Sequence, residues 1–250
     1  MGKRIAVINA CEHEFSIATN EHGGSNPLDL IHMQEDITTA RQESDYVLVI
    51  VHGGVELYQY PTPRMQHWYR YFVDLGADAV VNHHQHCVVG YEVYKERPIF
   101  YGLGNFFFPK PSVGQKNNSL WNNEYAVMLK LDERVTFEKI PYHQNVDGIT
   151  LRNQEEFEKE IEWLNRPIAD DDLLRQTFDE FILNSENSIK MQLLPSFMRG
   201  RLLSGLARRG YLGKLYNGNH VLALKNMFIC ESHYEVLQRL LMLLTRRYYM

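Results

Sequence analysis

Short apolar runs alternate with amphipathic stretches over the first 150 residues of the chain. Runs of β-branched and other apolar residues predict strands at 4–10, 46–51 and 77–81, whereas apolar spacing of three and four predicts helices over 30–44 and 64–75. The run "YVLVIV" at 46–51 has no polar position, which is typical of a parallel strand covered on both faces. The order strand, helix, strand predicts right-handed βαβ crossovers and therefore an α/β fold.

The pattern changes twice further along the chain. Two strand pairs follow first, at 87–94 with 97–103 and at 124–132 with 134–142, and a polar loop at 109–122 separates them. From about Gly148 onward the spacing is mostly helical. The helices expected there cover 154–165, 170–188, 196–208, 219–228 and 231–247. We therefore divide the chain into an α/β domain at 1–148 and an α-helical C-terminal extension at 149–250.

Composition restricts the functional class and the compartment. The chain is 44% hydrophobic and 23% charged with a net charge of −5, which is ordinary for a globular protein and does not indicate a nucleic-acid binder. Three widely spaced cysteines form no disulfide framework. The opening residues lack the apolar core of a signal peptide, and no apolar run reaches the ~18–20 residues of a membrane span. A cytoplasmic location is expected for the chain as it stands, and a cell-envelope location for a longer form carrying an anchor.

Charge is distributed unevenly over the helical extension. Residues 151–189 carry four basic and eleven acidic side chains, whereas 190–250 carry ten basic and two acidic ones. Within this basic part, the segment 196–218 places arginines among leucines and glycines. The segment could bind an anionic polymer or anionic lipid, or it could be a solvated helix face that balances the acidic stretch. Ordinary helix amphipathicity favours the second interpretation.

Histidines follow two of the predicted strands. His52 comes directly after the strand at 46–51, and the stretch "NHHQH" places His84 and His86 after the strand at 77–81. Ligands of open α/β sheets bind beyond the carboxyl ends of the parallel strands, and an H-x-H spacing on extended chain directs both side chains to one side. Histidines are also common at strand ends for no functional reason, but this combination favours part of a transition-metal shell. His83 is expected to face the other way and to pack.

The same residues belong to a longer pattern. It is a strand ending in His-x-Gly-x-Glu, a helix ending in Gly-Ala-Asp, a His-x-His strand end and an Ile-Phe-Tyr-x-Leu-Gly-Asn-Phe run. In this chain the pattern corresponds to His52, Gly54 and Glu56, then 76–78, then His84 and His86, and finally 99–106. Over about residues 4–140 the sequence therefore resembles the CapA-like proteins, a family linked to bacterial capsule and poly-γ-glutamate synthesis.

The resemblance implies a fold similar to that of calcineurin-like metallophosphoesterases, a sandwich of two sheets flanked by helices. In such proteins two divalent metals, expected to be Mn, Fe or Zn, hold a water that attacks a phosphoester. The resemblance implies His52, His84 and His86 as metal ligands, Glu56 and His84 as catalytic residues, and Asn105 as a substrate-binding residue. Asn82 stands where the family usually has Gly, and it is expected to bind substrate because its side chain could narrow the site. Two roles stay open, because Glu56 could be a solvated loop residue and Gly104-Asn105 a simple turn.

The chain also departs from the family pattern. CapA-like proteins carry a preceding half with Gly-Asp, Asn-x-Glu and Asn-His motifs, so this chain is expected to correspond to the C-terminal half of such a domain. Three alternatives follow: a surface-polymer biosynthesis protein with a divalent-metal, phosphoesterase-like site; a non-catalytic polymer-handling or assembly component; or a half whose site another polypeptide completes. The expected partners are an anionic surface polymer or its precursor and a membrane-associated synthesis complex, with no nucleic acid.

Overall fold

The structure is a computed structural model that describes residues 2–13, 17–18, 23–108, 118–185 and 218–249. It divides into two compact units, the first formed by Met1–Glu12 with Ser16–Gln176 and the second by His13–Phe15 with Thr177–Met250. The helix predicted at 196–208 lies outside the described residues, as does all but the last residue of the basic segment. In the described part of the chain, no helix combines the length and the apolar character needed to cross a bilayer.

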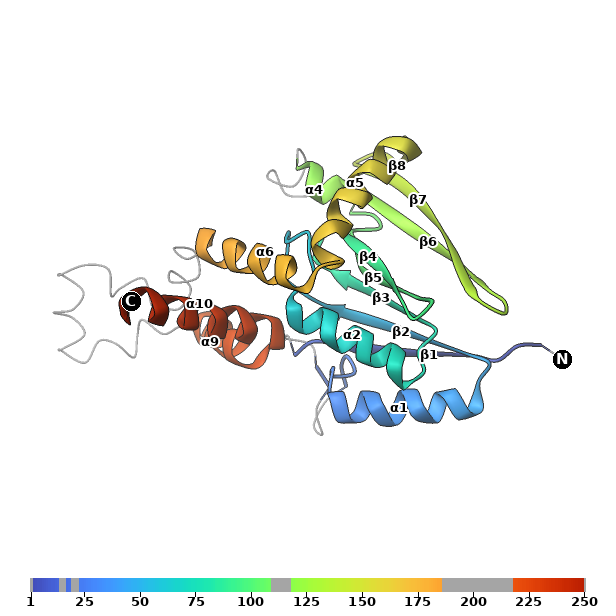
Figure 1. The fold of residues 1–250 in the computed structure, drawn as a ribbon, viewed down its shortest axis with the longest axis horizontal. Coiled ribbons are helices and arrows are strands. Elements are labelled where there is room, and N and C mark those ends of the chain that lie inside the picture. The colour runs from blue at the N-terminus through green and yellow to red at the C-terminus, as the bar shows by residue number, and fades with distance from the viewer. Residues whose placement is uncertain (1, 14–16, 19–22, 109–117, 186–217, 250) are drawn as a thin grey trace. The chain divides into compact units, whose positions relative to one another are not determined.

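A five-stranded sheet forms the centre of the first unit (Figure 1). Its strands, in spatial order, are β1 (Ile5–Cys11), β2 (Tyr46–Gly53), β3 (Ala79–His84), β5 (Arg97–Leu103) and β4 (Val88–Tyr94). The first four are parallel, and β4 pairs with β5 in the antiparallel direction. The α/β class is therefore confirmed, as are the strands expected from the apolar runs.

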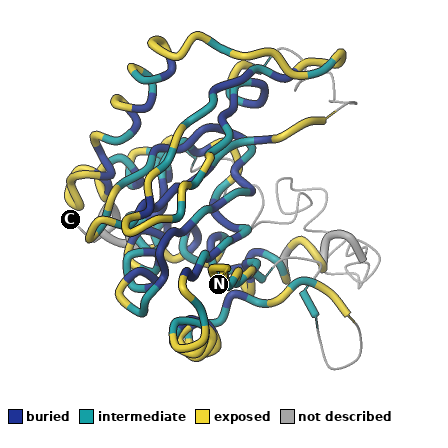
Figure 2. The backbone as a smooth tube through the Cα atoms, turned by 90° about the vertical axis from the view of Figure 1, so that its right-hand side faces the viewer, coloured by how far each residue is buried: buried dark blue, intermediate teal, exposed yellow. Residues whose placement is uncertain are grey.

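Two helices join the parallel strands, as predicted. Helix α1 (Leu30–Glu43) begins at Asp29, whose carboxylate accepts hydrogen bonds from the first free backbone N–H groups. Helix α2 (Pro63–Leu75) begins at Thr62 with proline in its first turn. Both helices bury apolar side chains against the sheet, and Figure 2 shows buried segments running through its strands. The core cluster includes Met33, Ile37, Met65, Tyr69, Phe72, Val47, Val49, Val51, Val80, Ile99 and Tyr101.

A second, antiparallel sheet of three strands follows in the chain. Its strands are β6 (Asn123–Leu131), β7 (Val135–Asn145) and β8 (Gly148–Leu151), and helix α4 (Ser119–Asn122) precedes it. The hairpin of β6 and β7 was predicted, whereas β8 and α4 were not, because four-residue elements have too few positions to show a period. Two sheets and flanking helices are thus present, and the metallophosphatase assignment stays a prediction.

The domain boundary differs from the predicted one at 148/149, because the first unit continues to Gln176. Helix α5 (Gln154–Ile168) packs Phe157, Ile161 and Leu164 into a cluster with residues of β4, β5 and β6. Its backbone also accepts a hydrogen bond at Ile168 O from Gln66 Nε2 at 2.7 Å. Sequence periodicity shows that such a helix has an apolar face, but it does not show which domain that face covers.

The second unit is helical, as expected for the end of the chain. It contains the C-terminal part of α6 (Asp171–Asn184), together with α9 (Gly218–Ile229) and α10 (Glu231–Tyr249). Arg239 of α10 forms a two-pronged ion pair with Asp179 of α6. This unit carries none of the predicted site residues.

Candidate functional site

Strand register brings the histidines together at the carboxyl ends of the parallel strands. His52 of β2 lies opposite Cys11 of β1 on one side and opposite His83 of β3 on the other, and Gly53 lies opposite His84. This is the edge of an open α/β sheet at which ligands bind. The adjacency of β2 and β3, expected from the βαβ order, therefore determines the cluster.

Two short contacts connect three of the rings. His52 Nδ1 lies 3.0 Å from His83 Nδ1, and His52 Nε2 lies 3.0 Å from His84 Nδ1. A neutral imidazole has one N–H donor and one acceptor nitrogen, so His52 satisfies both contacts only when it donates in one and accepts in the other. Burial lowers the pKa of His83, and the neighbouring His52 and His86 lower it further. The surroundings of His83 therefore favour its neutral form.

The backbone of the "HHQH" stretch is not extended. His84 has a φ of 127° and His86 a φ of 56°, values that L-residues other than Asn and Asp adopt rarely. Regular strand alternation therefore does not determine where His84 and His86 point, although their rings lie 5.9 Å apart. His83, expected to support a ligand or to pack, contacts His52. Such backbone outliers persist where the surrounding structure holds them, and they concentrate at functional sites.

Packing around Gln85 explains how this bend is held. The Gln85 carbonyl accepts a hydrogen bond from Leu57 N at 2.7 Å, and its buried side chain fills the space beside Gly54. A Cβ at Gly54, where φ is 113°, would lie 2.9 Å from Gln85 Cδ. The glycine of the His-x-Gly pattern thus admits the side chain that shapes the histidine bend.

Asn82, predicted to contact substrate, lies in the interior of the protein. Its exposed fraction is 0%, and its amide nitrogen contacts Gly53 O, Gln85 Oε1 and Tyr101 O at 2.8–2.9 Å. Its oxygen accepts from Tyr69 Oη at 2.7 Å. The side chain therefore joins β2, β3 and β5 below the histidines rather than facing the site.

Asn105, the other predicted substrate contact, lies directly beside His86. Asn105 Oδ1 is 2.6 Å from His86 Nδ1, and the indole of Trp121 stacks on the imidazole with ring centroids 4.5 Å apart. Asn105 is buried. The ring of His86 lies 5.9 Å from that of His84, centroid to centroid. The Gly-Asn pair is therefore part of the site and not an isolated turn.

Glu124 is a buried carboxyl group behind Asn105 that the sequence patterns did not indicate. Asn105 Nδ2 lies 3.3 Å from Glu124 Oε1. Burial raises the pKa of Glu124 to about 9, although hydrogen bonds from Asn105 and Gln144 oppose the shift. This carboxyl group is accordingly protonated at neutral pH. It lies at the start of β6, far from the histidines in sequence, so no motif spacing could have predicted it.

Glu12 is a second carboxylate that was missed. It follows β1 directly, and its backbone N–H donates to His52 O at 2.9 Å. Its buried carboxylate accepts from Gly54 N at 2.9 Å and from Arg64 Nη2 at 2.5 Å. His52 was selected because polar residues that directly follow a parallel strand are candidates for a site. The same rule, applied to β1, would have selected Glu12.

Glu56 lies apart from this cluster. It is exposed in the turn after β2, and among the described residues no hydrogen bond or ion pair joins it to a histidine. Its predicted catalytic role stays a prediction. The "Asp" of the Gly-Ala-Asp pattern serves the fold, because buried Asp78 pairs with Arg41 at 2.7 Å and Arg97 at 2.8 Å and accepts from Val47 N at 2.8 Å.

The donor set fits part of a metal shell. Two ligands bound at about 2.1 Å and about 90° apart lie about 3.0 Å from each other, which matches the spacing of His52 Nε2 and His84 Nδ1. Over the described ranges, however, no three His, Cys, Asp or Glu side chains are arranged to hold a metal ion. A metal ion held by these two nitrogens would need further donors besides the described side chains.

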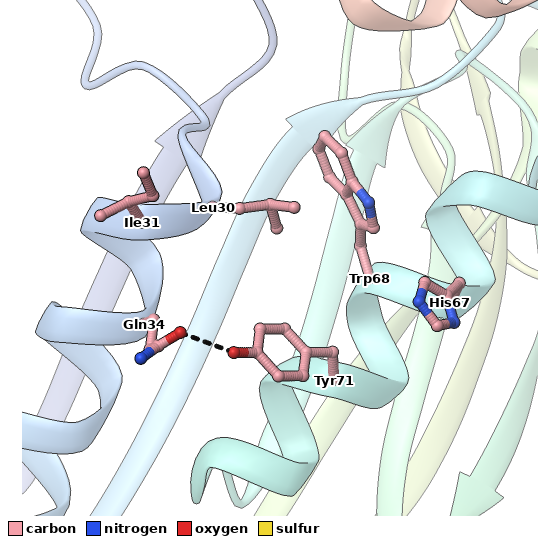
Figure 3. A pocket seen from close by; sticks show the side chains of 6 residues that line it. All are labelled: Leu30, Ile31, Gln34, His67, Trp68 and Tyr71. Carbon is pink, nitrogen blue, oxygen red and sulfur yellow. Dashed lines mark hydrogen bonds between the residues drawn. The ribbon is translucent and has the colours of Figure 1, made fainter.

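A pocket of about 310 Å³ lies between α1 and α2, with side chains from both helices at its wall (Figure 3). Trp68 and Tyr71 form its aromatic side, and Tyr71 Oη donates to Gln34 Oε1 at 2.7 Å. None of the predicted site residues lines this pocket. It is therefore separate from the histidine cluster.

Comparison with known proteins shows which family the segment that carries this site resembles. Residues 2–110 match the model of the family described as bacterial capsule synthesis protein PGA_cap. Residues 2–110 are thus similar to bacterial capsule synthesis proteins. The resemblance recognised from the motifs is thus confirmed, and all five strands of the first sheet lie inside the matched range.

Relatives of known name agree with this assignment. The capsule biosynthesis protein CapA of Bacillus anthracis is 36% identical over 109 residues, which are 42% of this chain and 26% of that protein. The PGA biosynthesis protein CapA of Bacillus subtilis (strain 168) is 37% identical over 84 residues, 34% of this chain and 22% of that protein. This chain spans about a quarter or less of the length of these relatives. The CapA-like segment contains every predicted site residue.

Proposed function

We propose that this protein acts in the biosynthesis of a bacterial capsule, poly-γ-glutamate or a related anionic surface polymer. The proposal follows from the similarity of residues 2–110 to capsule synthesis proteins and from the biosynthetic roles that the names of its relatives give. Its partners would be the polymer or a precursor and a membrane-associated synthesis complex. The histidine cluster would be the chemically active part of the protein.

We further propose that the cluster is part of a divalent-cation, phosphoesterase-like site. The observation that carries this proposal is the 3.0 Å approach of His52 Nε2 to His84 Nδ1 at the strand ends, with His86 on the adjoining bend. Imidazole nitrogens suit Zn, Fe and related ions, and Mn binds where oxygen donors are added. Glu12 is held by Arg64 and Gly54, so it fixes the loop beside the histidines.

Additional ligands would come from a further polypeptide segment, because the described side chains supply an incomplete shell. The face of β1 that adjoins His52 supports this idea. Ile5 and Val7 are 49% and 56% exposed, and strand alternation places them on the same face as Cys11, which pairs with His52. Half-exposed β-branched residues on a sheet face are typical of a surface that another segment covers.

Cation binding by the full chain tests the site. Isothermal titration with Mn²⁺ and Zn²⁺ is expected to show binding that the His84→Ala/His86→Ala variant loses at least tenfold, whereas Glu133→Gln, in the exposed turn between β6 and β7, serves as the control. An equal cation affinity in the wild type and the double variant would refute the proposed site. Phosphodiesterase activity is expected only when a chain or segment that supplies the remaining ligands is added.

A non-catalytic, polymer-handling role is the second candidate, and the incomplete donor set favours it. It predicts that a chromosomal His84→Ala substitution leaves the amount of surface polymer unchanged, provided that the variant accumulates to the normal level. Loss of polymer in that strain would exclude this role and support the phosphoesterase-like one.

A further inference from the structure

Asn105 is held from several directions, and only one of its polar atoms faces the histidine cluster. Its side-chain nitrogen donates to Trp121 O at 2.9 Å and to Glu124 Oε1 at 3.3 Å. Its backbone carbonyl accepts from Tyr142 Oη at 2.7 Å. The remaining atom, Oδ1, lies 2.6 Å from His86 Nδ1.

These neighbours determine the orientation of the amide. A reversed Asn105 amide would place its oxygen against the backbone carbonyl of Trp121, which can only accept a hydrogen bond. It would also leave its NH₂ facing the imidazole. The backbone carbonyl of Trp121 cannot donate in any protonation state, so the orientation with Oδ1 toward His86 is the one that satisfies every group.

The orientation of Asn105 in turn selects the tautomer of His86. An amide oxygen has no hydrogen, so the proton in the 2.6 Å contact belongs to His86 Nδ1. A neutral imidazole carries one ring proton, which leaves Nε2 unprotonated. Trp121 stacks on the ring at an interplanar angle of 25° and limits its rotation. We propose that Asn105, supported by Glu124, is a positioning residue that holds neutral His86 as the Nδ1–H tautomer.

Gly104 makes this arrangement sterically possible. Its φ is 83°, and a Cβ built on it would lie 1.2 Å from Glu124 Oε2. The Glu124 carboxyl group therefore occupies the space that any other residue at 104 would need for its side chain. Gly104 is therefore required for two reasons: the turn needs a positive φ, and the Glu124 carboxyl group that supports the Asn105 amide needs the space of a side chain.

The inference rests on the proposed function in one respect only, the cation that His86 Nε2 would bind. An unprotonated imidazole nitrogen is the form that ligates a cation, and ligating histidines commonly donate their other N–H to an oxygen of the protein. The tautomer itself is a property of the chain without any metal. It also gives Asn105 a task other than contact with substrate.

Long-range ¹H–¹⁵N spectroscopy of the full chain labelled with ¹⁵N-histidine tests the proposal in metal-free buffer at pH 8. A His86→Gln variant identifies the His86 signals. Wild-type His86 is expected to show a protonated-type Nδ1 and an unprotonated-type Nε2. In Asn105→Ala the ring is expected to change to mainly Nε2–H, the tautomer that imidazole side chains favour in water. Glu124→Gln keeps the acceptor oxygen and is expected to leave the wild-type spectrum, whereas Glu124→Leu is expected to give a mixture.

Each result supports or overturns the inference. An Nε2–H tautomer in the wild type would overturn it, and an unchanged tautomer in Asn105→Ala would show that Asn105 does not select it. If Asn105→Ala loses the dispersed spectrum of a folded chain, the comparison of Glu124→Gln with Glu124→Leu decides, because identical tautomers in both would overturn the role of Glu124. Titration of the wild type with Zn²⁺ is a separate arm: an unmoved Nε2 signal would count against the proposed cation site and leave the tautomer assignment intact.

Discussion

The buried carboxyl group of Glu124 makes the stability of this protein depend on pH in a defined direction. Its pKa is raised from 4.5 to about 9, chiefly by burial. Between these values the folded state keeps a proton that the unfolded state releases, so the free energy of unfolding falls as pH rises. The slope is about 1.4 kcal/mol per pH unit, which amounts to about 4 kcal/mol between pH 5 and pH 8.

The substitution Glu124→Gln removes this contribution, because an amide of nearly the same shape does not titrate. We expect the variant to gain stability relative to the wild type by about 4 kcal/mol between pH 5 and pH 8. Arg152 favours the charged form of Glu124. It therefore affects the size of the expected stability difference between the variant and the wild type, but not its sign. Other titrating groups are common to both chains and cancel in the difference.

Urea unfolding at pH 5, 6, 7 and 8, followed by tryptophan fluorescence, measures this difference. The control is Glu133→Gln, which replaces an exposed carboxylate in the turn between β6 and β7, and for which a constant difference is expected. A constant difference for Glu124→Gln as well would refute the reasoning, since it would mean that Glu124 ionises alike in the folded and unfolded states.

Three further substitutions test how the site is supported. Gly104→Ala is expected to lower the free energy of unfolding in urea by about 2–6 kcal/mol, because its Cβ would collide with Glu124 and its φ is positive. The control is Gly148→Ala, since Gly148 has a φ of 144° but nothing within 4 Å of the added Cβ. Equal losses of stability in the two variants would contradict the steric argument. Asn82→Ala should cost about 2–4 kcal/mol by leaving buried partners unsatisfied, and a change below about 0.5 kcal/mol would mean that its hydrogen bonds are dispensable. Asp78→Asn should cost about 3–5 kcal/mol by weakening two ion pairs at one buried carboxylate, and an unchanged thermal midpoint would argue against them.

Local patterns along the chain determined the elements and their order. The unbroken apolar run at 46–51 and the amphipathic spacing at 64–75 each depend on neighbouring residues only, and the structure has β2 and α2 at these places. The position of His52 and His84 at one sheet edge followed from the same order, because parallel strands in a βαβ unit end on the same side. The CapA-like motifs added the resemblance of residues 2–110 to capsule synthesis proteins.

Only the tertiary structure showed what lies around these residues. His83 meets His52 because β2 and β3 pair these two residues in register. The bend that begins at His84 and is held by the buried Gln85 has no periodic signal in the sequence. Glu124 reaches Asn105 from the second sheet, nineteen residues later in the chain. Local sequence determines which face of an element is apolar and where it ends. Packing between distant segments decides which polar side chains are buried from solvent, which glycine has no space for a Cβ, and which nitrogen of a histidine carries the proton.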